Sequence, residues 1–240
     1  WRRRILPLIG NDIVDLKHPM NLRKSTDSRF LKKILTDDEI SLVKSSSAPD
    51  AALWSIWACK EAAYKVFHKM SGVASFIPRR WTVFWETAPE NSHTAHHLPS
   101  GFPKAGRDDG GWSGFVHIPD FCKVFFHLNA THLYVHSIAS ESREALEGAL
   151  WRIDELPRAS SQTQADPSSF VRSRLTHHLA GLQGLGGQKI EIIRLSQNGQ
   201  PGPPLVYLNG RPSTIDISLS HDGDFTAFSY LSARPAGEGG

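Results

Sequence analysis

The chain has 240 residues, of which 40% are hydrophobic and 21% charged, a composition typical of a folded globular protein. No apolar run approaches the roughly 20 residues of a membrane helix. With only two cysteines, a disulfide scaffold or cysteine-rich zinc site is excluded, and we expect a reducing, cytoplasmic setting. The charge is uneven. Residues 1–80 carry 15 basic against 8 acidic side chains, the remainder 12 against 16. This favours an anionic partner, with a scattered solvated surface as the alternative.

The first third of the chain is expected to contain one strand followed by helices. Residues 5–16 predict a buried strand that ends in an acidic cluster. Residues 27–44 predict two short helices, because Thr36 and Glu39 have the spacing of a capping box. Residues 51–70 predict the longest helix of the chain.

The remainder of the chain alternates between polar segments and strand-like runs. Because no Met opens the chain, we expect a fragment or a processed form. The expected order is an exposed loop over 86–111, strands within 113–139, a helix over 141–153, a linker over 157–168, a helix over 168–182, four strands within 190–231 and a disordered tail from Pro235.

The helix over 51–70 is predicted to be covered on two faces. One face carries apolar side chains that must be core, whereas two tryptophans and a tyrosine on the opposite face are unusual for a solvated surface. We therefore expect Glu61 and Lys65 among aromatic rings, with a simple Glu–Lys pair on the helix as the alternative. The second face consists of Trp54, Trp57, Ala58, Glu61, Tyr64, Lys65 and His68.

Two further segments carry candidate chemistry. Asp12 and Asp15 close the first strand and, with a helix carboxylate, could hold Mg²⁺; the alternative is that they cap the next segment. Ser220 and His221 follow an alternating strand and could bind a phosphate or act as a base. Because neighbouring strand residues point to opposite faces, a serine-hydrolase pair is rejected. Metal binding by the histidines of residues 93–97 and nucleic-acid binding are both weakly supported.

Five blocks in a fixed order resemble the 4′-phosphopantetheinyl transferase superfamily, and most of all its holo-acyl-carrier-protein synthase branch. The blocks cover a little under half of the chain. They are GNDIVDL at 10–16, RFLKKILTDDE at 29–39, WACKEAAYK at 57–65, IEIIRLSQNGQPGPPLVYLNGRP at 190–212 and ISLSHDGDFTAFSYL at 217–231.

The resemblance implies Mg²⁺-dependent transfer of the phosphopantetheine arm of coenzyme A to a serine of an apo acyl carrier protein, releasing adenosine 3′,5′-bisphosphate. By motif, Asp12 and Glu61 resemble the metal-binding carboxylates, with Asp15 a weaker third. Catalysis would fall to Glu61 and Lys65. The residues expected to contact the coenzyme A phosphates are Lys60, Lys65, Ser220 and His221.

The resemblance also implies an α+β fold in which antiparallel sheets pack on helices. Because the short trimeric members are about half as long, we expect a pseudo-dimer of two similar halves. Residues 1–140 would carry the metal and phosphate site, with 86–111 as a loop insertion, and residues 141–234 the Ser-His block; residues 235–240 would form the tail. A monomer is expected, with a homotrimer as the alternative. Gln200 stands where Gly-Lys-Pro is usual, so one cationic contact is either absent or supplied elsewhere.

The basic early region fits an acidic carrier protein or carrier domain, and candidate docking residues are Arg23, Lys24, Arg29, Lys32 and Lys33. Two other functions stay open. One is a non-catalytic module that binds coenzyme A or a carrier protein, and the other is a Mg²⁺-dependent phosphohydrolase acting on coenzyme A.

Overall fold

The computed structural model describes residues 7–73, 75–86, 111–157, 166–182, 185–197 and 200–232. The predicted loop over 86–111, apart from its two end residues, and the predicted tail lie outside these residues, as do the histidines of residues 93–97. Among the described helices, none has the length and apolar character needed to cross a bilayer.

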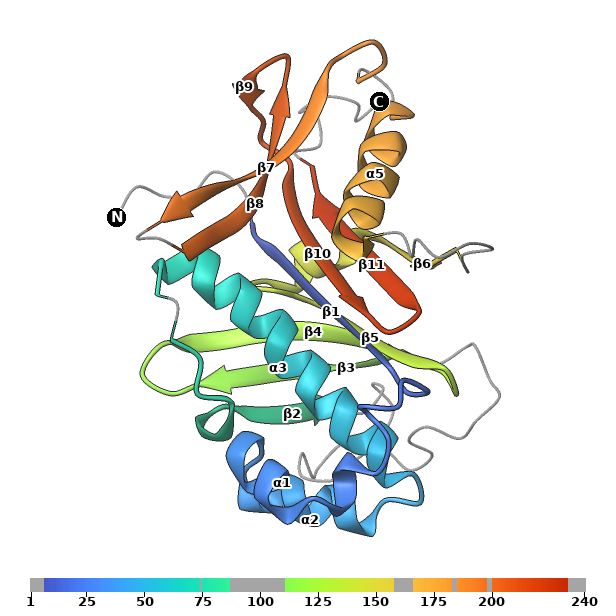
Figure 1. Cartoon of the computed structure of the whole chain (residues 1–240). Helices are drawn as coiled ribbons and strands as arrows, with labels where there is room; N and C mark the ends of the chain where they lie inside the picture. The colour runs from blue at the N-terminus through green and yellow to red at the C-terminus, as the bar shows by residue number, and fades with distance from the viewer. Residues whose placement is uncertain are drawn as a thin grey trace, which may run out of the picture.

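The N-terminal part is built on a five-stranded antiparallel sheet with strand order β1-β5-β4-β3-β2 (Figure 1). The first strand of the chain therefore lies at one edge, beside the last strand of this sheet. The strands are β1 (Ile9–Asp15), β2 (Thr82–Glu86), β3 (Trp112–Ile118), β4 (Cys122–Ala130) and β5 (Tyr134–Ser140).

Helices fill the connection between β1 and β2. The predicted capping box is confirmed: the Thr36 hydroxyl accepts the Glu39 N–H, and the Glu39 carboxylate accepts the Thr36 N–H. The elements are η1 (Lys24–Thr26), α1 (Ser28–Ile34), α2 (Asp37–Ser45), α3 (Pro49–Ser71) and η2 (Pro78–Arg80).

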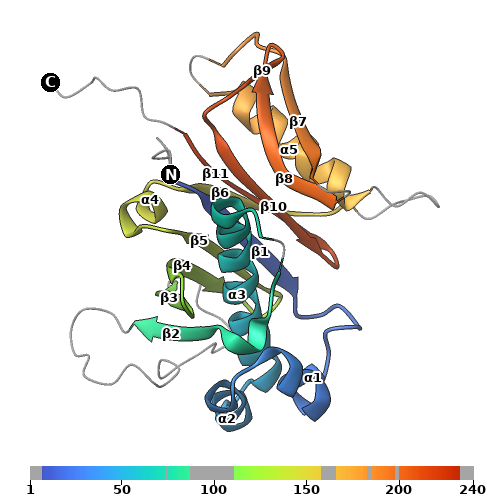
Figure 2. The same cartoon turned by 90° about the vertical axis from the view of Figure 1, so that its left-hand side faces the viewer.

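The 23-residue helix α3 crosses one face of the five-stranded sheet and packs on β1, β5 and β4 (Figure 2). Its approach to β1 is very close, because a Cβ on Gly10 would lie 2.0 Å from the Ala62 carbonyl oxygen. The aromatic face is covered, as predicted: Trp54 is buried, and Tyr64 stacks on Phe76 in the segment that returns along the helix. Lys65 forms an ion pair with Asp12 on β1, and the charge of Asp12 contributes to the raised pKa of Glu61.

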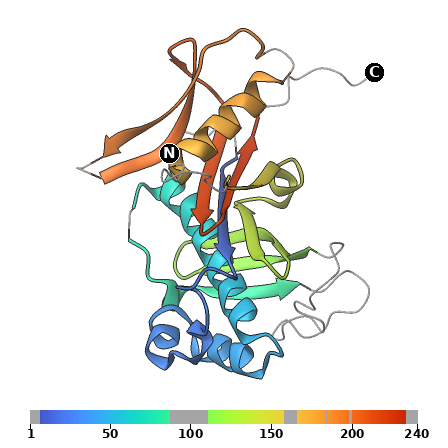
Figure 3. The same ribbon diagram turned by 45° about the vertical axis from the view of Figure 1, so that its right-hand side comes forward.

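The C-terminal part contains two three-stranded sheets, with orders β10-β11-β6 and β7-β8-β9. Helix α5 packs against β10, β11 and β7, and its buried Val171, Leu175 and Leu179 form a core with residues of these strands (Figure 3). The elements are α4 (Arg143–Glu147), β6 (Leu150–Glu155), α5 (Pro167–Ala180), β7 (Ile190–Gln197), β8 (Gln200–Leu208), β9 (Arg211–Pro212), β10 (Asp216–Asp222) and β11 (Phe225–Leu231).

The expected α+β class, with antiparallel sheets and packed helices, is confirmed. The predicted helix over 141–153 is wrong in its second half. Helix α4 ends at Glu147, and residues 150–155 form β6, which pairs with β11 over its whole length. Trp151 and Ile153 favour a strand, and the backbone pairing with β11 decides the outcome. Strand β2 was not predicted.

Candidate functional site

The site begins where the two parts of the chain meet along β1 and β10. Because β1 is an edge strand, every second N–H points away from β5. The N–H groups of Ile9, Asn11 and Asp15 donate to side chains of β10 that lie 207 positions further on, at 2.7–2.9 Å. The two strands therefore run side by side in the same direction, joined by side chains. The acceptors are the carboxylates of Asp216 and Asp222 and the hydroxyl of Ser218.

A cavity of about 230 Å³ opens between these strands. Its residues come from β1, α3, α5, β7 and β10, which are far apart in the sequence but adjacent in space (Figure 3). The cavity brings together four of the predicted site residues, Asp12, Lys65, Ser220 and His221. The full lining is Asp12, Lys65, Ser168, Val171, Arg172, Arg194, Leu219, Ser220 and His221.

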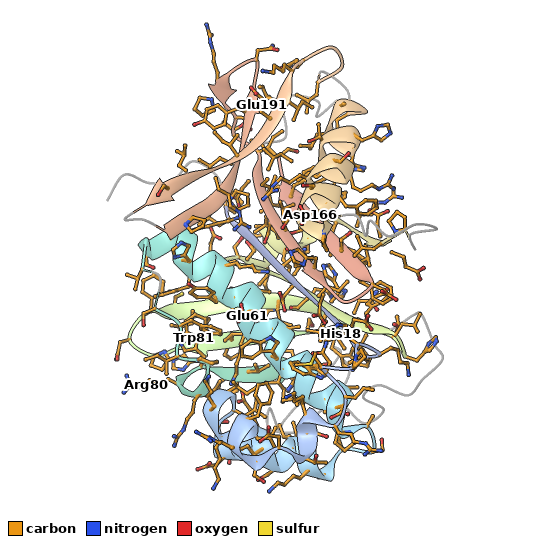
Figure 4. All side chains as sticks on the ribbon, viewed as in Figure 1. His18, Glu61, Arg80, Trp81, Asp166 and Glu191 are labelled. Carbon is orange, nitrogen blue, oxygen red and sulfur yellow. The ribbon has the colours of Figure 1, made fainter. Side chains whose placement is uncertain are left out.

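One wall of the cavity holds a cluster of interacting charges. The Lys65 ammonium donates to the Asp12 carboxylate at 3.0 Å and to the Asn11 carbonyl at 2.5 Å. Burial raises the pKa of Asp12, and Lys65 opposes this. Glu61, midway along α3 (Figure 4), lies one helical turn before Lys65 but is not among the residues that line the cavity. The pKa of Glu61 is raised to about 7, chiefly by burial and then by the charge of Asp12, whereas Lys65 acts in the opposite direction.

The opposite wall is basic. The Ser168 hydroxyl, in the first turn of α5, lies 3.2 Å from Nε2 of His221; Asp166 caps that turn (Figure 4). Arg172 and Arg194 line the same cavity, and burial, followed by the charge of Arg172, lowers the pKa of Arg194. Two guanidiniums and an imidazole around one cavity are suited to binding phosphate oxygens.

Ser220 is the buried polar side chain of this cavity that lacks a partner. Its side-chain oxygen is inaccessible to water and forms no hydrogen bond within the described part of the chain, and the residue is 6% exposed. On β10 it lies between Ser218 and Asp222, which accept N–H groups from β1. The same offset of 207 positions places it opposite Ile13. A buried hydroxyl without a partner is energetically costly, and here it lines the cavity.

Three predicted site residues are outside the cavity lining: Glu61, described above, and Asp15 and Lys60, which have other partners. Both carboxylate oxygens of Asp15 accept backbone N–H groups, from Lys17 at 2.8 Å and Asp224 at 3.0 Å, and so hold the β10–β11 turn. Lys60 is completely buried and forms an ion pair with Glu39 at 2.6 Å. Their surroundings fit structural roles.

Three polar residues of the cavity lining were not predicted from the sequence: Ser168, Arg172 and Arg194. Arg194 had a signal that could have been used. It lies at the inward position of β7 that follows Ile190 and Ile192, and both isoleucines pack on the C-terminal core. An arginine in such an alternating row points to a charged interior site. Ser168 and Arg172 are one turn apart on α5 and carry no comparable signal.

The donor set of the charged wall suits a hard cation. Asp12 and Glu61 are carboxylates with raised pKa values, and Mg²⁺ is bound by one or two carboxylates together with water and phosphate oxygens. Among the described residues no group of three His, Cys, Asp or Glu side chains forms a metal cluster. These two carboxylates could hold Mg²⁺ only together with water and substrate phosphates.

Comparisons with known proteins agree with the resemblance found in the sequence. The model of the 4′-phosphopantetheinyl transferase superfamily matches residues 8–99, which include Asp12, Glu61 and Lys65 but not the Ser-His block. A holo-[acyl-carrier-protein] synthase of Leptospira biflexa serovar Patoc is 36% identical over 64 residues, which are 27% of this chain and 50% of that protein. Those of Campylobacter curvus and Campylobacter fetus subsp. fetus are 40% and 41% identical over 58 residues, 24% of this chain and 47% of each relative. The aligned segment thus spans about half the length of these curated relatives.

Proposed function

We propose that this chain transfers the 4′-phosphopantetheine arm of coenzyme A to a serine of an apo acyl carrier protein, with Mg²⁺, and releases adenosine 3′,5′-bisphosphate. The observation that carries the proposal is the cavity in which Asp12 and Lys65 of the N-terminal part face Ser220 and His221 of the C-terminal part. The superfamily match over residues 8–99 supports it independently.

The basic wall is assigned to the phosphates of coenzyme A. The guanidiniums of Arg172 and Arg194 and the imidazole of His221 offer donors to phosphate oxygens, and the unpaired Ser220 hydroxyl would gain a partner. Gln200 stands where Gly-Lys-Pro is usual in the family, and Arg194 would supply the missing cationic contact to coenzyme A. At about 230 Å³ the cavity is smaller than the roughly 300–1,000 Å³ of pockets for drug-sized ligands. It is therefore assigned to the phosphate portion of coenzyme A.

The charged wall is assigned to the reaction. Mg²⁺ held by Asp12 and Glu61 would neutralise charge on the pyrophosphate. The serine hydroxyl oxygen forms a bond to the phosphorus that carries the pantetheine arm, and the bond from this phosphorus to the bridging oxygen breaks. Lys65 stabilises the negative charge that develops. Glu61, or a water that it holds, takes the hydroxyl proton, and a pKa of about 7 suits a base that works near neutrality.

The carrier protein is proposed to dock on the basic surface after β1. Arg23, Arg29, Lys32 and Lys33 are exposed there, and η1 and α1 follow β1, the strand that carries Asp12. Acidic carrier proteins would be attracted to this surface over long range. We also propose that residues 1–140 and 141–234 act as two halves of a pseudo-dimer with the site between them, and that a monomer suffices.

The test is incubation of the protein with coenzyme A, Mg²⁺ and apo acyl carrier protein, followed by intact-mass spectrometry of the carrier. The mass of one phosphopantetheine arm should be added. Folded Asp12→Ala and Glu61→Ala variants should lose the reaction by a factor of 100 or more. Arg172→Ala with Arg194→Ala should weaken coenzyme A binding.

Other outcomes would reject the transferase. Binding of coenzyme A without transfer to any of several carriers would leave the binding module. Consumption of coenzyme A with an unchanged carrier would indicate the phosphohydrolase.

A further inference from the structure

We infer that Lys69 is a positioning residue, which fastens β10 to β1 and so holds the two walls of the cavity in register. The predicted effect on coenzyme A binding rests on the proposed function. Lys69 is neither in the cavity lining nor among the residues predicted from the sequence.

The ammonium of Lys69 joins three elements at one point. It donates to the Asp216 carboxylate at 2.8 Å, to the Ile217 carbonyl at 2.6 Å and to the Ile9 carbonyl at 2.7 Å. A lysine ammonium carries three N–H donors, and all three of these oxygens lie within hydrogen-bond distance of it. The same oxygen of Asp216 also accepts the Ile9 N–H at 2.7 Å. One ion pair thus connects the last turn of α3 with the beginnings of β1 and β10.

The position of this ion pair determines which residues face each other in the cavity. Lys69 lies one helical turn beyond Lys65, and its contact at Ile9 lies two residues before the contact of Lys65 at Asn11. On the other strand, Ser220 lies four residues beyond Asp216. Fixing Ile9 to Asp216 therefore sets the register in which Asp12 and Lys65 meet Ser220.

Because the ion pair between Lys69 and Asp216 is largely buried, it favours one register of β10 along β1. The Lys69 side chain is 5% exposed and that of Asp216 17%. Removing one partner of a buried ion pair leaves a charge without compensation, which is costly. A slip of β10 along β1 would separate all these groups at once, so the ion pair favours one register strongly. Near the opposite ends of the two strands, Asp15 and Asp222 fix the same register through the Asp15 N–H.

The chain contains a matched control in Lys60. Its ammonium also meets one carboxylate and two carbonyls, of Glu39, Ile34 and Pro78, at 2.6–3.0 Å. It is on the same helix and is even more buried, but it connects α1, α2 and η2 and does not contact β10. Loss of either lysine should lower stability, whereas only loss of Lys69 should disturb the cavity.

The experiment compares Lys69→Met with Lys60→Met in the full chain, at a temperature where both variants are folded by circular dichroism. Coenzyme A affinity is measured by calorimetry, and amide hydrogen exchange of Asn11 and Asp15 by NMR. We expect Lys69→Met to weaken coenzyme A binding at least tenfold and to accelerate exchange of both amides at least tenfold. Lys60→Met should bind coenzyme A within twofold of wild type.

Equal coenzyme A affinity of the two variants, with unchanged exchange at Asn11, would overturn the inference. If Lys69→Met does not fold, Asp216→Asn, which keeps an acceptor oxygen but removes the charge, takes its place with the same expected directions. The exchange measurement needs no ligand. If wild type bound no coenzyme A, the proposed function would fail, while faster exchange at Asn11 in the variant would still support the positioning role.

Discussion

Ionisation of the Glu61 carboxyl lowers the free energy of unfolding, so the stability of the protein depends on pH. Burial, followed by the charge of Asp12, raises the pKa of Glu61 from 4.5 to about 7. Between these two values the folded chain keeps a proton that the unfolded chain releases, so stability falls as pH rises across this window and is level above it. The full shift corresponds to roughly 3 kcal/mol.

Glu61→Gln should therefore become progressively more stable than wild type as pH rises from about 4.5 to 7. Urea unfolding of the ligand-free protein at several pH values measures the difference. Glu155→Gln, at an exposed position on β6, is the control and should show a flat difference. A flat difference for Glu61→Gln as well would mean that its pKa is not raised.

Residues of the same type, close together on one element, have different partners in this structure. This limits what the sequence alone can predict. Asp12 and Asp15 lie three positions apart on β1, but only Asp12 lines the cavity. Lys60 and Lys65 lie five positions apart on α3, and their ammonium groups meet different sets of partners. Asp12 and Lys65, which motif resemblance selected for their predicted roles, line the cavity. The resemblance could not separate them from Asp15 and Lys60, because the partners of the latter pair come from distant elements.

At the scale of elements, the contact between β1 and α3 controls where the charged wall lies. A Cβ on Gly10 would come within 2.0 Å of the Ala62 carbonyl oxygen and 3.1 Å of a Val66 methyl. The backbone of α3 cannot move away without disturbing the helix. Gly10→Ala should therefore lower the free energy of unfolding by about 1–3 kcal/mol or more, as measured by urea unfolding. Gly148→Ala, whose Cβ would meet nothing nearer than 3.6 Å, should change stability little. Equal stabilities of the two variants would contradict the close packing.

Periodicity predicted most elements because their apolar patterns are local. The long helix, the two helices joined by the Thr36 capping box and the strands within 113–139 and 190–231 were found in this way. The predicted helix over 141–153 extended into residues that form β6, because the pairing of β6 with β11 is a long-range contact that no local pattern shows. For the same reason the neighbouring position of β1 and β10 could not be read from the sequence. Their N–H groups are joined to side chains 207 positions away.

At the scale of the whole molecule, both walls of the cavity belong to one chain. Asp12 and His221 line the same space, although 209 positions separate them. In a trimer that shares sites between subunits, by contrast, each complete site takes residues from two chains. The proposed monomer thus differs from the trimer in a property that can be measured without a crystal.

Asp12→Ala and His221→Ala, each inactive alone, should therefore stay inactive when combined. The two variants are co-expressed with different affinity tags, purified through both tags in turn and assayed for transfer to the carrier protein. If each site of a trimer took Asp12 from one subunit and His221 from its neighbour, every trimer that contains both variants would regain about one of its three sites. One of its three interfaces would join an intact Asp12 to an intact His221. With the site inside one chain, every molecule keeps one defect. Little protein should pass both columns, and any that does should be inactive. Recovered activity would place the functional site between chains.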